Sequence, residues 1–316
     1  MLVYLATYPR SGNSLLQRIL VHNFWRLPSQ MKASARHVPR IGKIAGWERR
    51  LAPAAIADWP EAAVWTPYTA LYRRKAADEP WRRQLLDIPA EHLTLELRQA
   101  LAGESTPFFL KTHNLPFAAF LDGEAVIQVV RSPGPALWSY FRLLVRQAIE
   151  RGAPAWQAPP PTLDRIIAGD VQFGGWSDYH AAWAKAGAAL GERLLTLRFE
   201  GMSEDQSSVR TALHRFLRLP VMAEAPVDFE AYRSRHPDHG LRGTDEGYER
   251  CFSTDQLERL WALHGARAEA LGYGPPGMAN AGDGEQVADL NRLVELAWSA
   301  ASAHHAADAA VDGHAE

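Results

Sequence analysis

The first twenty residues constrain the fold of this chain more than any other segment does. An apolar run that favours β structure, residues 2–5, ends in Thr7-Tyr8-Pro9, and a polar loop of sequence Arg-Ser-Gly-Asn-Ser covers residues 10–14. The segment that leaves the loop is amphipathic, with leucine and isoleucine at helical spacing. This order predicts a strand, a tight turn and the N-terminus of a helix.

The residue types of this loop suit a bound anion. Gly12 lets the backbone approach an oxygen closely, and Ser11, Asn13 and Ser14 supply hydrogen-bond donors. The N–H groups at the helix start add partial positive charge, and Arg10 adds a full charge. We therefore expect a cradle for phosphate or an isoelectronic group, although an ordinary strand-to-helix turn with a chance glycine has the same pattern. The loop is not a Walker A motif, because it lacks the G-x-x-x-x-G-K-[ST] pattern.

The composition is that of a soluble globular protein. The chain has 316 residues and a formal net charge of −2, which argues against a nucleic-acid binder. Its single cysteine, Cys251, leaves no intrachain disulfide and no cysteine-based metal site. The N-terminus lacks the basic region of a signal peptide, and no apolar run has membrane-spanning length. We expect a cytoplasmic protein with no membrane partner.

Short apolar runs alternate with amphipathic segments along most of the chain, and this alternation predicts an α/β fold with a central parallel sheet and helices on both faces. Ligands of such sheets bind at the carboxyl ends of the strands. The expected strands begin at residue 2 and cover 108–113, 125–130 and 193–199. The expected helices cover about 14–26, 53–57, 68–77, 91–102, 133–145, 176–189, 206–218 and 254–271.

The composition changes near residue 275, so we expect one domain over residues 1–274 and a C-terminal extension over 275–316. An amphipathic pattern predicts a helix over about 286–302 within the extension. The last dozen residues, rich in alanine and polar side chains, are expected to be disordered.

A second chemical signal lies at the end of the strand over 108–113. Lys111 and His113 are two residues apart and so point to the same side of a strand. The lysine can neutralise charge on a transferring group, and a histidine with a pKa near neutrality can take a proton from an attacking hydroxyl. A histidine at a strand end is also common as a purely structural residue. Combined with the Arg10 loop, the pair fits transfer of an anionic group.

Two further segments carry cations where a second phosphate could bind. Arg131 ends the strand over 125–130, and Ser139 lies about two turns into the next expected helix. An arginine and a serine in this arrangement can hold a phosphate apart from the first one, although a solvated arginine is the simpler interpretation of Arg131 alone. Arg242 and Gly243 lie in a glycine-containing loop that could supply another phosphate contact.

Together these motifs resemble the sulfotransferases that use 3′-phosphoadenosine 5′-phosphosulfate (PAPS), and the resemblance covers about residues 2–272. The loop of this family reads T-Y-P-[KR]-S-G-[NT]-[ST]-W, against residues 7–15 here, and its K-T-H strand end matches residues 111–113. Its R-[ND]-P motif with a following serine matches Arg131-Ser132-Pro133 and Ser139, and its R-K-G loop matches residues 241–243. The resemblance implies a three-layer α/β, P-loop-like sulfotransferase fold.

The resemblance also implies a role for each matched residue. His113 would be the base that deprotonates the acceptor, Arg10 would stabilise charge on the bridging oxygen, and Lys111 would hold sulfuryl oxygens. The 5′-phosphosulfate cradle would consist of Ser11, Gly12, Asn13 and Ser14. The 3′-phosphate would be held by Arg131, Ser139, Arg242 and Gly243. Phe229 would lie near the adenine, together with Phe199, which stands where a tyrosine is usual.

Four of the departures from the family pattern bear on the chemistry or the assembly. Arg10 replaces the lysine of many members, and because guanidinium does not titrate usefully it can hold charge but cannot donate a proton. Leu15 stands where a tryptophan usually stacks on adenine, and Leu241 removes one cation of the 3′-phosphate loop. The resemblance also implies a homodimer role for the family's G-W-[KR]-x-x-F segment, which is similar to residues 247–252 here, and Glu249 in place of a basic residue weakens this role.

We therefore expect an enzyme that moves the sulfuryl group from PAPS to a hydroxyl or amine of a small-molecule acceptor, releasing 3′-phosphoadenosine 5′-phosphate (PAP) without a metal. A P-loop kinase is the first alternative, but it would need the G-K-[ST] ending and a strand that ends in aspartate for Mg²⁺. An inactive nucleotide-binding relative is the second, against which the intact Lys111 and His113 argue. The acceptor itself cannot be identified from the sequence.

Overall fold

A computed structural model describes the chain over residues 1–24, 69–74, 83–88, 95–103, 107–151, 162–171, 173–228 and 247–312. The chain divides into two compact units. The first unit joins residues 1–130 to 182–236, and the second joins 131–181 to 237–316. Among the described helices, none is long and apolar enough to cross a membrane. The predicted boundary near residue 274 is not one of the boundaries between these units and stays a prediction.

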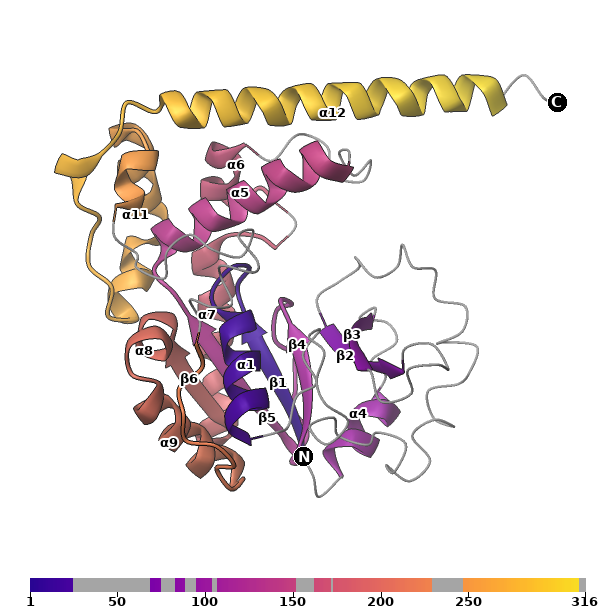
Figure 1. Ribbon diagram of the computed structural model, residues 1–316, viewed down its shortest axis with the longest axis vertical. Coiled ribbons are helices and arrows are strands. Elements are labelled where there is room, and N and C mark those ends of the chain that lie inside the picture. The colour runs from indigo at the N-terminus through magenta and orange to yellow at the C-terminus, as the bar shows by residue number, and fades with distance from the viewer. Residues whose placement is uncertain are drawn as a thin grey trace. The chain divides into compact units, whose positions relative to one another are not determined.

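A six-stranded sheet forms the centre of the first unit, with the strand order β3-β2-β4-β1-β5-β6. The four strands β4, β1, β5 and β6 are parallel, whereas β2 is antiparallel to β4 and to β3 (Figure 1). The predicted α/β fold with a central parallel sheet is confirmed. The strands are β1 (Leu2–Thr7), β2 (Thr69–Arg74), β3 (Arg83–Ile88), β4 (Phe108–Thr112), β5 (Glu124–Val130) and β6 (Leu194–Arg198).

The inner strands are apolar and buried throughout. Every residue of β1 and of β5 is buried, as the continuous apolar runs of a strand covered on both faces require. Helices α1 and α4 pack against β1, and α8 packs against β6. The helices of this unit are α1 (Asn13–Phe24), α4 (Leu95–Ala102), α8 (Phe199–Glu204) and α9 (Gln206–Leu217), and α7 (Trp176–Leu190) crosses from the second unit into the first.

Helices make up the second unit. α12 and α6 both pack against α5, and α11 packs against α5 and α6. α11 begins at a capping box in which the Ser253 hydroxyl accepts from Gln256 N and the Gln256 side chain accepts from Ser253 N. The helices are α5 (Pro133–Arg151), α6 (Leu163–Ala168), α11 (Thr254–Ala270) and α12 (Glu285–Asp312), with short 3-10 turns at Tyr248–Cys251 and Met278–Asn280.

Two parts of the sequence differ from expectation. The helix predicted over 68–77 is wrong, because residues 69–74 form β2, which pairs with β3 and with the end of β4. Pairing with distant strands outweighs the local helical pattern, and β3 had no expectation at all. α12 reaches Asp312 and so extends into the segment expected to be disordered, consistent with the strong helix preference of its alanines. The helix expected over 53–57 lies outside the described residues.

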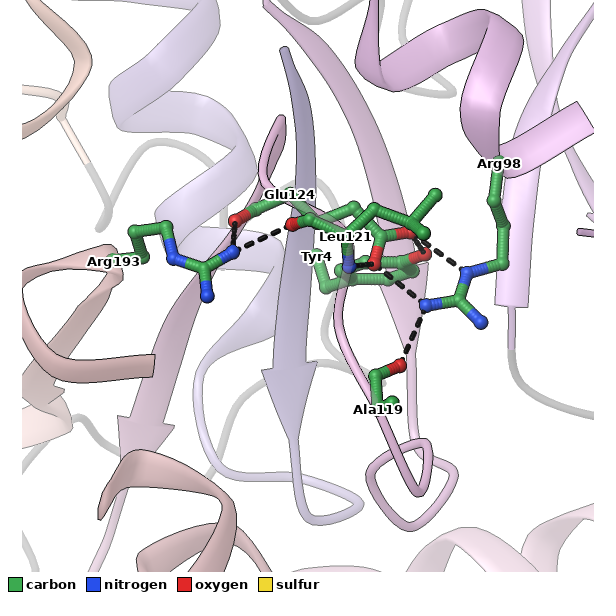
Figure 2. A network of polar contacts seen from close by, with 6 residues as sticks. All are labelled: Tyr4, Arg98, Ala119, Leu121, Glu124 and Arg193. Carbon is green, nitrogen blue, oxygen red and sulfur yellow. Dashed lines mark hydrogen bonds and ion pairs between the residues drawn. The ribbon is translucent and has the colours of Figure 1, made fainter. Parts of the chain in front are cut away.

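A buried ion pair connects α4 to the amino end of the parallel strands (Figure 2). Arg98 on α4 donates from Nε and a terminal nitrogen to the two carboxylate oxygens of Glu124, at 2.8 and 2.6 Å. Tyr4 Oη and Leu121 N also donate to this carboxylate, at 2.6 and 2.8 Å, so both of its oxygens are satisfied. Burial, followed by the Glu124 charge, raises the pKa of the Tyr4 phenol well above its usual range. Arg193 donates to the Leu121 and Glu124 carbonyl oxygens from the opposite side.

Candidate functional site

The loop between β1 and α1 has the backbone form of an anion cradle. Arg10 and Gly12 both adopt positive φ, at 65° and 105°. Ser11 N donates to Tyr8 O at 3.1 Å and closes the turn, while Leu15 N and Leu16 N both donate to Gly12 O and start the helix. A non-glycine residue at positive φ is uncommon, and such strain concentrates at functional sites.

Only glycine fits at position 12. A Cβ there would lie 2.6 Å from Phe199 Cδ2 and 3.0 Å from Met202 Cε, and the φ of 105° is itself unfavourable for other residues. Phe199, predicted to lie near the adenine, is buried and packs against the loop from inside the protein. Its role toward the nucleotide stays a prediction, and its contact with Gly12 gives it a part in shaping the loop.

Several donors of the loop have no acceptor among the described residues. The first N–H groups of α1, those of Asn13 and Ser14, lack helical partners because of their position at the helix start. Ser11 is fully buried, and its Oγ has no hydrogen-bond partner within the described part of the chain. A buried hydroxyl of this kind is rare and costs free energy, which points to an external acceptor. The loop therefore fits the oxygens of a phosphate or phosphosulfate group.

The sheet places His113 beside the end of β1. β4 and β1 are parallel, and Ala6 pairs with Thr112, so Thr7 and His113 are neighbours at the carboxyl ends of the two strands. His113 Nδ1 lies 2.6 Å from Thr7 O and 3.2 Å from Thr7 Oγ1. A carbonyl oxygen can only accept, so Nδ1 carries the hydrogen and, in the neutral ring, Nε2 carries the lone pair.

The surroundings of His113 keep its ring neutral. The pKa of His113 is lowered to about 3. Burial is the largest cause, the charge of Lys111 comes next, and the charge of Arg10 also contributes. The bond to Thr7 O acts in the opposite direction but is outweighed. The expectation of a pKa near neutrality is therefore wrong for the protein without bound ligand, because it took the ordinary value of histidine and left out the enclosure of the ring and the neighbouring cations.

The side chain of Asn13 is turned into the protein. Its Nδ2 donates to Thr7 Oγ1 at 3.3 Å and to Leu5 O at 3.5 Å, while its Oδ1 accepts from Gln17 Nε2. These contacts leave the backbone N–H of Asn13 as the group that this residue offers to a ligand. By contrast, Ser14 is exposed and Arg10 is partly exposed.

The residues predicted for the 3′-phosphate lie partly in the second unit. Arg131 and Ser139 are both buried there, and Arg131 O accepts a hydrogen bond from Trp176 Nε1 at 3.2 Å. Pro133 begins α5, as expected for a proline in a first helical turn. The other predicted nucleotide contacts, Phe229, Arg242 and Gly243, lie outside the described residues.

Sequence reasoning missed two residues of the site, Thr7 and Gln17. Thr7 was treated as part of the motif without a role, yet it contacts His113 through two of its oxygens. Gln17 lies four residues after Asn13 on α1, a spacing that brings side chains together on a helix. That spacing was the signal available in the sequence. Among the described residues, no three His, Cys, Asp or Glu side chains gather as a metal site.

A parallel sheet whose first strand leads through this loop into α1, with Lys111 and His113 at the neighbouring strand end, defines a P-loop-like α/β protein. The sequence model described as "Sulfotransferase domain" matches residues 2–235. The chain therefore belongs to the sulfotransferase family.

Solved structures similar to this chain have low sequence identity to it. The mouse sulfotransferase SULT7A1 complexed with PAP is 14% identical, with a TM-score of 0.42 and coverage of 93% of this chain and 89% of that chain. Retinol dehydratase with androsterone and the inactive cofactor PAP is 14% identical, with a TM-score of 0.46 and coverage of 85% and 80%. Retinol dehydratase with retinol and PAP is 11% identical, with a TM-score of 0.42 and coverage of 85% and 81%. A comparison with curated proteins gave no match.

Proposed function

We propose that this sulfotransferase moves the sulfuryl group of PAPS to a hydroxyl or amine of a small-molecule acceptor, with His113 as the base. The observation that carries the proposal is the contact of His113 Nδ1 with Thr7 O at 2.6 Å, beside the anion loop. It leaves Nε2 as the nitrogen that can take a proton, at the strand end that also bears Lys111. The buried Ser11 hydroxyl supports the assignment of the loop to an anionic donor.

In the proposed reaction, the acceptor oxygen or nitrogen forms a bond to the donor sulfur while the bond from sulfur to the bridging phosphate oxygen breaks. His113 Nε2 takes the acceptor proton. Lys111 and Arg10 stabilise negative charge on the sulfuryl and bridging oxygens, and the N–H groups at the start of α1 add to this. Arg10 holds charge only, because its guanidinium stays protonated, so PAP leaves as an anion.

The low pKa of His113 in the free protein is compatible with this role. Lys111 and Arg10 contribute to that low value, and an anionic donor beside them would offset their charge and raise the pKa of His113. The base would thus become stronger once the donor is bound. In the protein without ligand, His113 is neutral across the physiological pH range.

The 3′-phosphate, on the same proposal, binds Arg131, Ser139, Arg242 and Gly243, with Phe229 near the adenine. The acceptor, on the same proposal, is a small molecule. A cytoplasmic location, a homodimer and a metal-free reaction belong to the same proposal. EDTA should leave the transfer rate unchanged, whereas a kinase reaction dependent on Mg²⁺ would stop.

The deciding experiment combines an acceptor screen using sulfur-labelled PAPS with the variant His113→Ala. The variant should lose at least about 100-fold in turnover, the loss expected for a missing general base, while PAP affinity measured by calorimetry stays within about twofold of the wild type, since no predicted PAP contact is removed.

His214→Ala is the matched control, because His214, on α9, also has its Nδ1 2.6 Å from a backbone carbonyl oxygen, that of Leu219. It should retain full turnover. Near-normal transfer by His113→Ala would disprove the base assignment, and failure of the wild type to bind PAP would disprove the donor assignment.

A further inference from the structure

Four side chains form a continuous path from the first turn of α1 to the ring of His113. Gln17 Nε2 donates to Asn13 Oδ1, Asn13 Nδ2 donates to Thr7 Oγ1 at 3.3 Å, and Thr7 Oγ1 lies 3.2 Å from His113 Nδ1. Thr7 is fully buried, and Asn13 and Gln17 are 9% and 8% exposed. The path therefore lies inside the protein, between the helix that follows the loop and the strand end that carries the base.

We propose that Asn13 and Gln17 are positioning residues that hold Thr7 against His113 and so fix which ring nitrogen of His113 is protonated. The inference rests on the proposed function for its catalytic consequence. It assigns the Asn13 side chain to the protein interior instead of to the bound donor.

The polarity of the contacts fixes the orientation of the Asn13 amide. Gln17 donates to Asn13 Oδ1, so the amide nitrogen must face the other way, toward Thr7 Oγ1 and Leu5 O, both of which can accept. A flipped amide would place an oxygen against the Leu5 carbonyl oxygen and a nitrogen against the Gln17 donor. The Leu5 carbonyl oxygen, which can only accept, therefore sets this orientation, and Gln17 Nε2 satisfies the Asn13 oxygen that is left on the other side.

Thr7 then acts on His113 through its carbonyl and hydroxyl oxygens. Nδ1–H donates to Thr7 O at 2.6 Å, with Oγ1 as a second acceptor at 3.2 Å. If Thr7 moves, the ring loses the partners that keep the proton on Nδ1, and the tautomer with the proton on Nε2 becomes populated. In that tautomer the lone pair is on Nδ1, which faces Thr7, so Nε2 cannot take the proton of the acceptor.

The charges that face the ring favour its neutral form without selecting a tautomer. Lys111 comes from β4, and Arg10 comes from the loop after β1. Both disfavour the doubly protonated ring, but neither can accept a hydrogen bond from Nδ1. The choice between the two neutral tautomers thus falls to Thr7 and to the residues that hold it.

The test uses the full-length variants Asn13→Leu and Gln17→Met, which keep approximate size and remove the amide. Long-range ¹H–¹⁵N correlation spectra of the histidine rings, with His113→Gln used for assignment, report the tautomer without any substrate. We expect the wild type to carry the proton on Nδ1 and both variants to show a substantial share of the Nε2-protonated form. Turnover should fall about 10- to 100-fold, the usual cost of a misplaced catalytic group, with the KM for PAPS within about threefold of wild type.

Asn23→Leu is the matched control. Asn23 is a buried asparagine at the other end of α1, and its amide donates to Ala223 O and Ala225 O at 2.6 and 3.0 Å. This variant should lose stability but keep the wild-type His113 spectrum and turnover. Thr7→Ser, which retains the hydroxyl, should also keep the wild-type tautomer, whereas Thr7→Val keeps only the backbone carbonyl as acceptor and should show a share of the Nε2-protonated form.

A His113 spectrum unchanged in both Asn13→Leu and Gln17→Met would overturn the inference, whatever their activity. If Asn13→Leu fails to fold, the spectra of Gln17→Met and Thr7→Val decide. If the wild type transfers no sulfuryl group, the proposed function fails, and the tautomer comparison still decides the inference. A changed tautomer together with a changed KM and an unchanged kcat would contradict the positioning role.

Discussion

The hydroxyl of Ser11 lies fully buried at the turn of the anion loop, with no hydrogen-bond partner among the described residues. An unsatisfied buried hydroxyl costs about 1–3 kcal/mol. The variant Ser11→Ala should therefore keep or raise the melting temperature of the ligand-free protein. The same variant should weaken PAP binding by about 1–2 kcal/mol, because it removes a donor to a charged phosphate. Thermal melts with and without PAP, together with calorimetry, measure both effects.

Ser203→Ala is the control for this prediction. The Ser203 hydroxyl already donates to Phe199 O at 3.1 Å, so its loss should leave PAP affinity unchanged. A Ser11→Ala protein that is clearly less stable than the wild type without ligand would mean that the hydroxyl has a partner in solution.

The site shows which residue properties can be inferred from sequence and which cannot. Gly12 and the donors around it follow from residue type and order, because a βα turn exposes its own N–H groups whatever surrounds it. The pKa of His113 and the direction of the Asn13 amide do not, because both depend on packing between β1, β4 and α1. A histidine in a motif has its ordinary pKa until the fold encloses it.

At the scale of elements, the Arg98–Glu124 pair holds α4 on the sheet. Removing the arginine alone should lower the free energy of unfolding much more than replacing both partners. The variant Arg98→Met leaves the buried Glu124 carboxylate without its cation and should cost about 3–5 kcal/mol of unfolding free energy. The double variant Arg98→Met/Glu124→Gln should recover a large part of this loss, because no buried charge remains and the glutamine can still accept from Tyr4 or Leu121. Urea unfolding of the wild type, the single variant and the double variant measures the loss and its recovery.

PAP affinity is the internal control for these two variants. Glu124 begins β5, so the pair lies at the amino end of the parallel strands, whereas the anion loop follows the carboxyl end of β1. Binding should therefore be unaffected in folded variants. A cost below about 1 kcal/mol for Arg98→Met would show that the pair is solvated and contributes little.

The elements found from sequence are those with a local signal. The four parallel strands are apolar runs bounded by polar turns, and α9 and α11 carry clear starts at Asp205 and Ser253. β2 and β3 pair with each other, and β2 also pairs with β4; no pattern within six residues specifies such partners. Local reasoning therefore assigned a helix to residues that complete the sheet.

For the molecule as a whole, buried neutral histidines predict a loss of stability in weak acid. Burial lowers the pKa of His180 and of His113 to about 3, and it also lowers the pKa of His264. The unfolded chain takes up these protons below its ordinary pKa of about 6.5, and the folded chain does not. The free energy of unfolding should therefore fall as the pH drops from about 6.5 to 5, by up to about 1.4 kcal/mol per pH unit for each such histidine.

Urea unfolding between pH 5 and 7.5 tests this dependence. The variant His180→Leu should reduce the slope of the unfolding free energy against pH by the contribution of one histidine. Stability that is flat across this range in the wild type would contradict the neutral state of the buried rings.

The packing of α12 on α5 affects where the boundary of the folded region lies. Val287, Val294 and Trp298 bury their side chains along α12, which packs against α5, yet the family match ends at residue 235. Residues 131–181 and 237–316 form one folded body, so a border placed at the end of the match divides that body. A fragment trimmed to the matched range would keep α5 and α6 while discarding the helices that cover them. For this chain, the region recognised by similarity is smaller than the region that must be produced together.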